Sequence, residues 1–81
     1  MLDEIKGIIS TLETIKEDDA VPKNIRSKIN STLTSLNEKA EINLTVDRVI
    51  EELDEVSNDA NLPPYTRIEI MNVISVLGGI Q

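Results

Sequence analysis

The 81-residue sequence contains no cysteine, histidine, tryptophan or phenylalanine, and Tyr65 is its single aromatic residue. Without cysteine, neither a disulfide nor a thiolate metal site can form. Without histidine, the chain lacks the most common general base and a common metal ligand. Hydroxyl nucleophiles are plentiful, but serine and threonine need an activating base. We therefore expect no enzyme activity, no cofactor and no metal site. An enzyme that uses carboxylates alone is the third functional hypothesis, after the two binding hypotheses given below.

Long apolar runs are also absent, and none approaches the roughly 20 residues that a membrane-spanning helix needs. Residues 1–6 mix charged and apolar side chains, unlike a signal peptide, which leads from basic residues into an apolar run. Basic residues are few: eight Lys and Arg face fifteen Asp and Glu, so the net charge is −7. That sign is unfavourable for binding a phosphate backbone. We expect a cytoplasmic protein without a membrane or direct nucleic-acid partner.

The sequence does contain an internal repeat. Segments 18–26 and 59–67 share Asp, an apolar residue, Pro and Arg in the same order, each shifted by 41 positions. Flanking apolar residues recur with the same shift, and the pairs are Ile9 and Ile50, Leu12 and Leu53, Ile15 and Val56, Ile29 and Ile70, Leu33 and Ile74, and Leu36 and Leu77. Repeats of this period are typical of stacked helical hairpins that cannot bury their apolar faces alone.

Apolar residues at spacings of three and four predict four helices. Their expected ranges are residues 3–18, 22–37, 46–58, and 63 or 64 to 77. Thr45 is suited to cap the third helix, with Leu44 and Val49 forming a hydrophobic staple. Gly78 and Gly79 are expected to end the fourth helix in the left-handed conformation.

These helices predict an all-α fold, an antiparallel four-helix bundle made of two repeated helical hairpins in a single domain. The first hairpin covers residues 3–37, a linker covers 38–44, and the second hairpin covers 45–78. Pro22 is expected at the first position of the second helix. Gly7 costs about 1 kcal/mol inside the first helix, so we expect that helix to fray there or to have a close neighbour.

Arginine recurs just after each turn. Arg26 and Arg67 lie four residues beyond Pro22 and Pro63 and can reach back toward Asp18 and Asp59 respectively. One interpretation is a pair of anion-binding arginines. The other is a structural ion pair that recurs because the hairpin recurs, and we favour it because partly buried arginine is normally paired.

An acidic cluster lies in the third helix. Its members are Glu51, Glu52, Asp54 and Glu55. The cluster is interpreted as a solvated face, with electrostatic docking of a basic partner as the functional alternative. A carboxylate metal site in a helix bundle normally includes histidine, which this chain lacks.

The fourth helix carries a second row in addition to its core stripe. The row consists of Tyr65, Ile68, Asn72 and Val76. The corresponding positions of the second helix are Asn24, Ser27, Ser31 and Ser35. If exposed, the row is expected to be an interface with a protein partner or in a homodimer. The alternative is that the linker residues Ile42 and Leu44 cover it as part of the core.

The leading functional hypothesis is a non-enzymatic protein-interaction or scaffold module acting through the fourth helix. The runner-up is an acidic accessory subunit. It would dock a basic protein, including one that binds nucleic acid, through the third helix.

Segments 21–26 and 62–67, each preceded by a helix ending in Asp and followed by an apolar helix, resemble those of the archaeal uncharacterised protein family 0147. The resemblance covers essentially the whole chain. It implies a small all-helical bundle in an archaeal cytoplasm, with no activity, cofactor or catalytic residue to transfer. The hairpin also loosely resembles a HEAT repeat. Ile25 and Arg26 fit that pattern, whereas Thr66 and Arg67 depart from it, and two repeats are too few for a solenoid.

Overall fold

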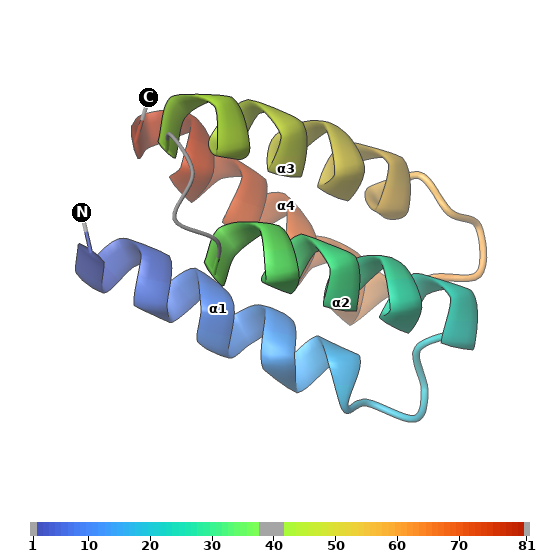
Figure 1. The fold of residues 1–81 in the computed structure, drawn as a ribbon. Helices are drawn as coiled ribbons and strands as arrows, with labels where there is room; N and C mark the ends of the chain where they lie inside the picture. The colour runs from blue at the N-terminus through green and yellow to red at the C-terminus, as the bar shows by residue number, and fades with distance from the viewer. Residues whose placement is uncertain (1, 38–41, 81) are drawn as a thin grey trace.

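Four α-helices make up the fold in the computed structural model, which describes residues 2–37 and 42–80 (Figure 1). The helices are α1 (Leu2–Lys16), α2 (Lys23–Asn37), α3 (Ile42–Ser57) and α4 (Pro64–Ile80). The all-α prediction is confirmed. Within the described ranges, no helix combines the length and the apolar character needed to cross a bilayer.

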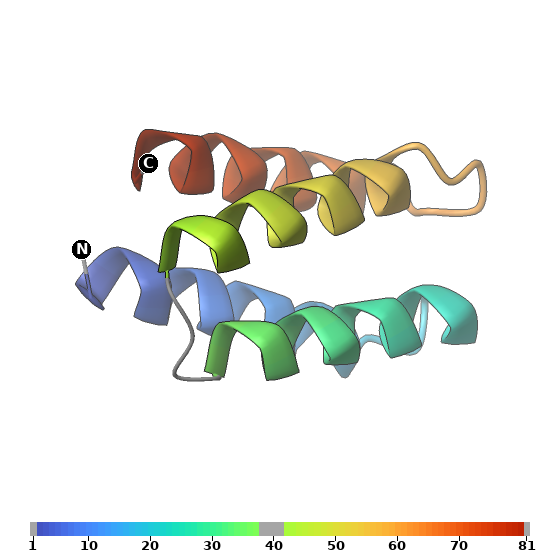
Figure 2. The same cartoon turned by 45° about the horizontal axis from the view of Figure 1, so that its top comes forward.

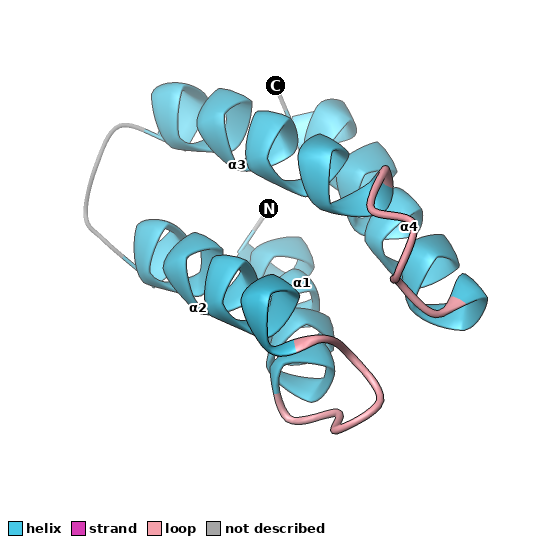
Figure 3. Ribbon diagram, turned by 90° about the vertical axis from the view of Figure 1, so that its right-hand side faces the viewer, coloured by secondary structure: helices cyan, strands magenta, loops and turns pink. Residues whose placement is uncertain are grey.

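Consecutive helices run antiparallel and form two layers. Figure 2 shows α3 and α4 above α1 and α2, and Figure 3 shows the turns of both hairpins at the same end of the bundle. Within each hairpin the helices pack closely, and α2 packs closely against α3. The α1–α4 contact that closes the bundle is the sparsest of the four.

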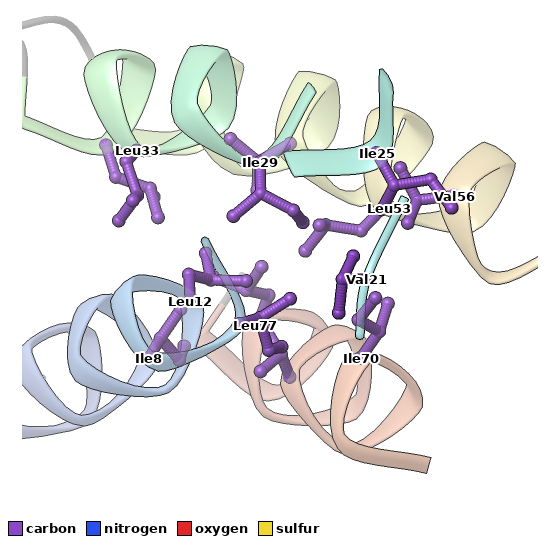
Figure 4. Close-up of a cluster of buried hydrophobic side chains, with 14 of the residues drawn as sticks. Ile8, Leu12, Val21, Ile25, Ile29, Leu33, Leu53, Val56, Ile70 and Leu77 are labelled. Carbon is purple, nitrogen blue, oxygen red and sulfur yellow. The ribbon is translucent and has the colours of Figure 1, made fainter. Parts of the chain in front are cut away.

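The buried hydrophobic side chains among the described residues are all aliphatic and come mostly from equivalent positions of the two repeats. Leu12 and Leu53 have no exposed surface, and the same is true of Ile29 and Ile70. These side chains point toward one another from all four helices (Figure 4). Each hairpin therefore supplies the apolar surface that covers the other, as the repeat period predicted.

The two turns have the same geometry. A carboxylate oxygen of Asp18 accepts a hydrogen bond from the Ala20 amide at 2.9 Å, and Asp59 accepts one from Asn61 at the same distance. Such side-chain bonds to the backbone two residues ahead are typical of Asx turns. Because Asp18 belongs to the turn, α1 ends at Lys16, two residues before the predicted end.

The prolines lie at the starts of α2 and α4. The carbonyls of Pro22 and Pro63 accept the amides of Arg26 and Arg67, both at 3.0 Å. Pro22 therefore directly precedes α2 and, contrary to the prediction, is not its first residue, because α2 begins at Lys23. Pro64 is the first residue of α4. A proline fits that first position because its missing N–H would have no partner within the helix.

The start of α3 differs from the prediction. The helix begins at Ile42, so Thr45 lies inside it and is buried instead of capping it. Leu44 is 69% exposed, so it forms no hydrophobic staple. Because the helix begins three residues before Thr45, its free end is not at Thr45, and the predicted cap has no helix end to satisfy. The rest of the predicted linker, residues 38–41, lies outside the described ranges.

The predicted glycine cap of α4 is also wrong. Neither Gly78 nor Gly79 has a positive φ, and α4 continues to Ile80. Gly7 likewise lies within α1, and a Cβ atom there would meet no heavy atom within 4 Å. The close neighbour expected at Gly7 is therefore not supplied by the described part of the chain.

Replacing Gly7 with alanine should stabilise the protein. Alanine is favoured over glycine by about 1 kcal/mol in a helix interior, and space for the methyl group is open. For a domain of this size, the expected rise in the unfolding midpoint is about 4–8 °C, measured by circular dichroism. An unchanged or lower midpoint would contradict the helical placement of residue 7.

Candidate interaction surface

The outer side of α4 exposes large apolar side chains. Tyr65 is 72% exposed, Ile68 59%, Met71 56% and Val76 39%. Together with the exposed Asn72, these five residues are called the α4 face below. The predicted row therefore lies at the surface. Met71 was absent from the prediction, although it continues the spacing of three from Tyr65 and Ile68.

The alternative in which the linker covers this row is wrong for Leu44, whose own side chain is mostly exposed. The side chain of Ile42 lies outside what the structure describes. A covering leucine would have to lose most of its accessible surface by packing against the row, and Leu44 does not.

The α4 face contains no charged residue. The 17-residue helix has two ionisable side chains besides Tyr65, namely Arg67 and Glu69, and both are half-buried. Helices that are apolar on all sides are usually buried, whereas α4 leaves one side open. By contrast, α1, α2 and α3 each expose charged side chains, such as Lys6, Lys28 and Glu51.

A groove of about 590 Å³ runs between α1 and α4, next to the α4 face. It is lined by Glu4, Gly7, Ile8, Thr11, Tyr65, Glu69, Asn72, Val73 and Val76. Ile8 and Val73, each 4% exposed, form its apolar floor. Three of its lining residues also belong to the α4 face, so groove and face form one continuous surface.

The repeat explains why this groove is open. At the α2–α3 junction, Arg48 donates a hydrogen bond to the Ser35 hydroxyl at 3.2 Å. A shift of 41 positions places Gly7 and Val76 at the equivalent points of the α4–α1 junction. Glycine has no side chain and valine has no polar atom, so no such bridge can form there. The groove therefore lies at the α4–α1 junction, which lacks, at these two positions, the hydrogen-bonded side chains found at the α2–α3 junction.

The turn arginines do not make the predicted ion pairs. Arg67 Nε donates to the Ser57 carbonyl at 2.9 Å, and its Nη2 donates to the Asp59 carbonyl at 2.8 Å. The Asp59 carboxylate instead accepts the amide of Asn61. Arg67 therefore closes its turn by bonding carbonyl groups at the end of α3 and just beyond it, a recognised role of basic residues there.

Arg26, its counterpart, is less well satisfied. Its Nη1 lies 3.8 Å from a carboxylate oxygen of Asp19, not of the predicted Asp18, and Asp19 is fully exposed. Its Nε is buried and has no hydrogen-bond partner among the described residues. The two arginines are equivalent in sequence, but only Arg67 is bonded to the end of the preceding helix.

The acidic cluster on α3 lies at the surface around an arginine. Glu51, Asp54 and Glu55 are exposed, and Glu52 is half-buried with one oxygen 4.0 Å from Arg48 Nε. The four acidic residues and Arg48 line a depression in the surface. In the part of the chain that the structure describes, no group of three acidic side chains is placed to hold a metal ion.

Comparison with known proteins points to one family. Residues 2–80 match the model of the Uncharacterised protein family (UPF0147). A UPF0147 protein of Methanosarcina mazei is 39% identical over 74 residues, covering 90% of this chain and 80% of the relative. One from Sulfurisphaera tokodaii is 36% identical over 79 residues, covering 96% of this chain and 89% of the relative. The crystal structure of MMP1188, a protein of unknown function, matches with a TM-score of 0.90 and 38% identity, covering 99% of this chain and 92% of that one.

Alanine substitutions at the two turn arginines should have different costs. Arg67→Ala removes two charge-assisted hydrogen bonds and should lower the free energy of unfolding by about 1.5–3 kcal/mol. Arg26→Ala removes a surface ion pair and should cost less than about 1 kcal/mol. Urea titrations of both variants measure the difference. Equal losses would contradict the asymmetry between the two turns.

Proposed function

The chain belongs to the uncharacterised protein family UPF0147, as its sequence resemblance predicted, and we propose that it is a non-enzymatic protein-interaction module. The α4 face is the binding surface of this proposal. The proposed activity is binding because the chain has neither histidine nor cysteine to activate a nucleophile. A cytoplasmic location is part of the proposal.

The observation that carries the proposal is an exposed, uncharged, largely apolar face on a chain of net charge −7. The repeat provides an internal control. At the equivalents of Tyr65, Ile68 and Val76, α2 has Asn24, Ser27 and Ser35. The fold therefore accepts polar residues at these positions, and the apolar ones in α4 are not required for packing. Exposed apolar patches of this kind mark protein–protein interaction sites.

A second candidate uses the acidic cluster of α3. Three of its four carboxylates are exposed, which supports docking of a basic protein by long-range attraction. Binding of that kind weakens strongly as salt is raised, because exposed charges are screened. Apolar association through α4 depends much less on salt, so binding that persists at high salt would favour the α4 face over the acidic cluster.

A charged residue on the α4 face should not disturb folding. Ile68→Glu should change the free energy of unfolding by no more than about 0.5 kcal/mol, since the side chain is largely exposed. Ile70→Glu, two positions along the same helix, should cost several kcal/mol or abolish folding, because Ile70 has no exposed surface. Denaturant titrations test both. A large loss for Ile68→Glu would assign that residue to the core.

Site-specific crosslinking tests the function itself. A photo-reactive amino acid is placed at Ile68 in one variant and at Asp54, on the acidic cluster, in a matched variant. Both are expressed in an archaeal host that has a UPF0147 relative. Crosslinked protein adducts should form chiefly from residue 68. Adducts chiefly from residue 54 would favour the second candidate, and none from residue 68 would contradict the proposal.

A further inference from the structure

We propose that the groove between α1 and α4 binds an amphipathic helix of another protein, one whose apolar stripe is flanked by lysine or arginine. The inference rests on the proposed function, because it specifies the partner of the same surface. The shape of the groove, its charge and the position of Gly7 each support this occupant.

The groove has the shape of a helix site. Its walls are residues 4–11 of α1 and residues 65–76 of α4, about 10 and 16 Å long at 1.5 Å per residue. Its floor is apolar at Ile8 and Val73, and it continues onto the α4 face through Tyr65 and Val76. An amphipathic helix that inserts its apolar side into such a groove is a recurrent mode of peptide recognition.

The charge of the groove favours a basic partner over a second copy. Each wall contributes one carboxylate, Glu4 from α1 and Glu69 from α4, and no lysine or arginine is among the described lining residues. A second copy would carry the same net charge of −7. The single basic residue of its α4, Arg67, already donates to two carbonyls in the turn. Cationic flanks on the incoming helix would complement Glu69 on the α4 wall.

Gly7 leaves the α1 wall open for close approach. Glycine at this helical position costs about 1 kcal/mol relative to alanine. No atom of the described chain lies so close that a side chain would be excluded there. Its repeat equivalent, Arg48, closes the α2–α3 junction by bonding Ser35. A glycine here lets another backbone approach α1 closely. The partner helix is thus expected to lie in the space that Arg48 fills at the other junction.

Three designed peptides serve as the probes. Two share one helical leucine stripe, flanked by lysine in the first and by glutamate in the second. The third has the composition of the lysine peptide in an order that destroys the stripe. Fluorescence anisotropy with the full chain should show saturable binding of the lysine-flanked helix, at least about tenfold tighter than that of either other peptide, as close charge pairs and apolar contact would together give.

Variants of the chain locate the binding. Gly7→Leu fills the groove and should weaken binding of the lysine-flanked helix about tenfold or more, whereas Ser27→Leu, on the exposed side of α2, should not. The pair Gly7→Arg and Val76→Ser, which copies the α2–α3 closure, should weaken it similarly. Glu69→Gln should reduce the preference for lysine over glutamate flanks, and Glu55→Gln, outside the groove, should leave it unchanged. Circular dichroism confirms that each variant is folded.

Several results would overturn the inference. These are equal binding of the lysine and glutamate peptides, binding to neither, or unchanged binding by Gly7→Leu. Light scattering over about a hundredfold range of concentration tests self-association by mass action. A dimer that Gly7→Leu dissociates would make a second copy the occupant, and the inference would be wrong. In all these cases, crosslinks from residue 68 would leave the proposed function standing, and their absence would contradict both.

Discussion

The aliphatic side chains at the centre of the bundle come from both hairpins, and neither hairpin can bury its apolar stripe without the other. Leu12 and Ile29 from the first, and Leu53 and Ile70 from the second, have no surface exposed to solvent. Burial of each such side chain contributes about 1.5–3 kcal/mol, and the chain has no disulfide to add to it. Turn geometry, helix pairing and the open junction between α1 and α4 all depend on this mutual covering.

The two repeats share their core and turn residues but differ at exposed positions. Residues needed for the core and the turns are kept in both copies: leucine at positions 12 and 53, and aspartate in both Asx turns. Positions outside the core differ between the two copies. Where the first copy has hydroxyl and amide side chains on α2, the second has Tyr65, Ile68 and Val76 on α4. The two copies therefore share the fold but differ in the polarity of an exposed helix side, and an exposed apolar patch is typical of an interaction site.

The two junctions of the bundle show how a groove can arise without any change of backbone architecture. At one junction a long side chain, Arg48, spans the space between α3 and α2. At the other its equivalent is Gly7, and the space stays open above an apolar floor. The substitution lowers the helix propensity of α1 and exposes the groove, two costs that a bound partner helix would offset. The turn arginines diverge as well, since Arg67 bonds two carbonyls and Arg26 lies near one exposed carboxylate.

The sequence by itself determined the helices, the hairpins, the aliphatic core and the family. Periodic apolar spacing is visible among neighbouring residues, and the exact 41-residue shift is visible when the chain is compared with itself. The sequence also identified the row on α4, but not whether solvent reaches it, since exposure depends on what the other elements cover. Helix ends were less predictable: Thr45 and Gly78 are good capping residues, yet the backbone continued as helix through both. Only the tertiary structure decided the arginine partners and the groove. The arginine partners depend on the geometry of each turn. The groove depends on distances between α1 and α4, whose facing residues lie about sixty positions apart in the chain and share no periodic signal.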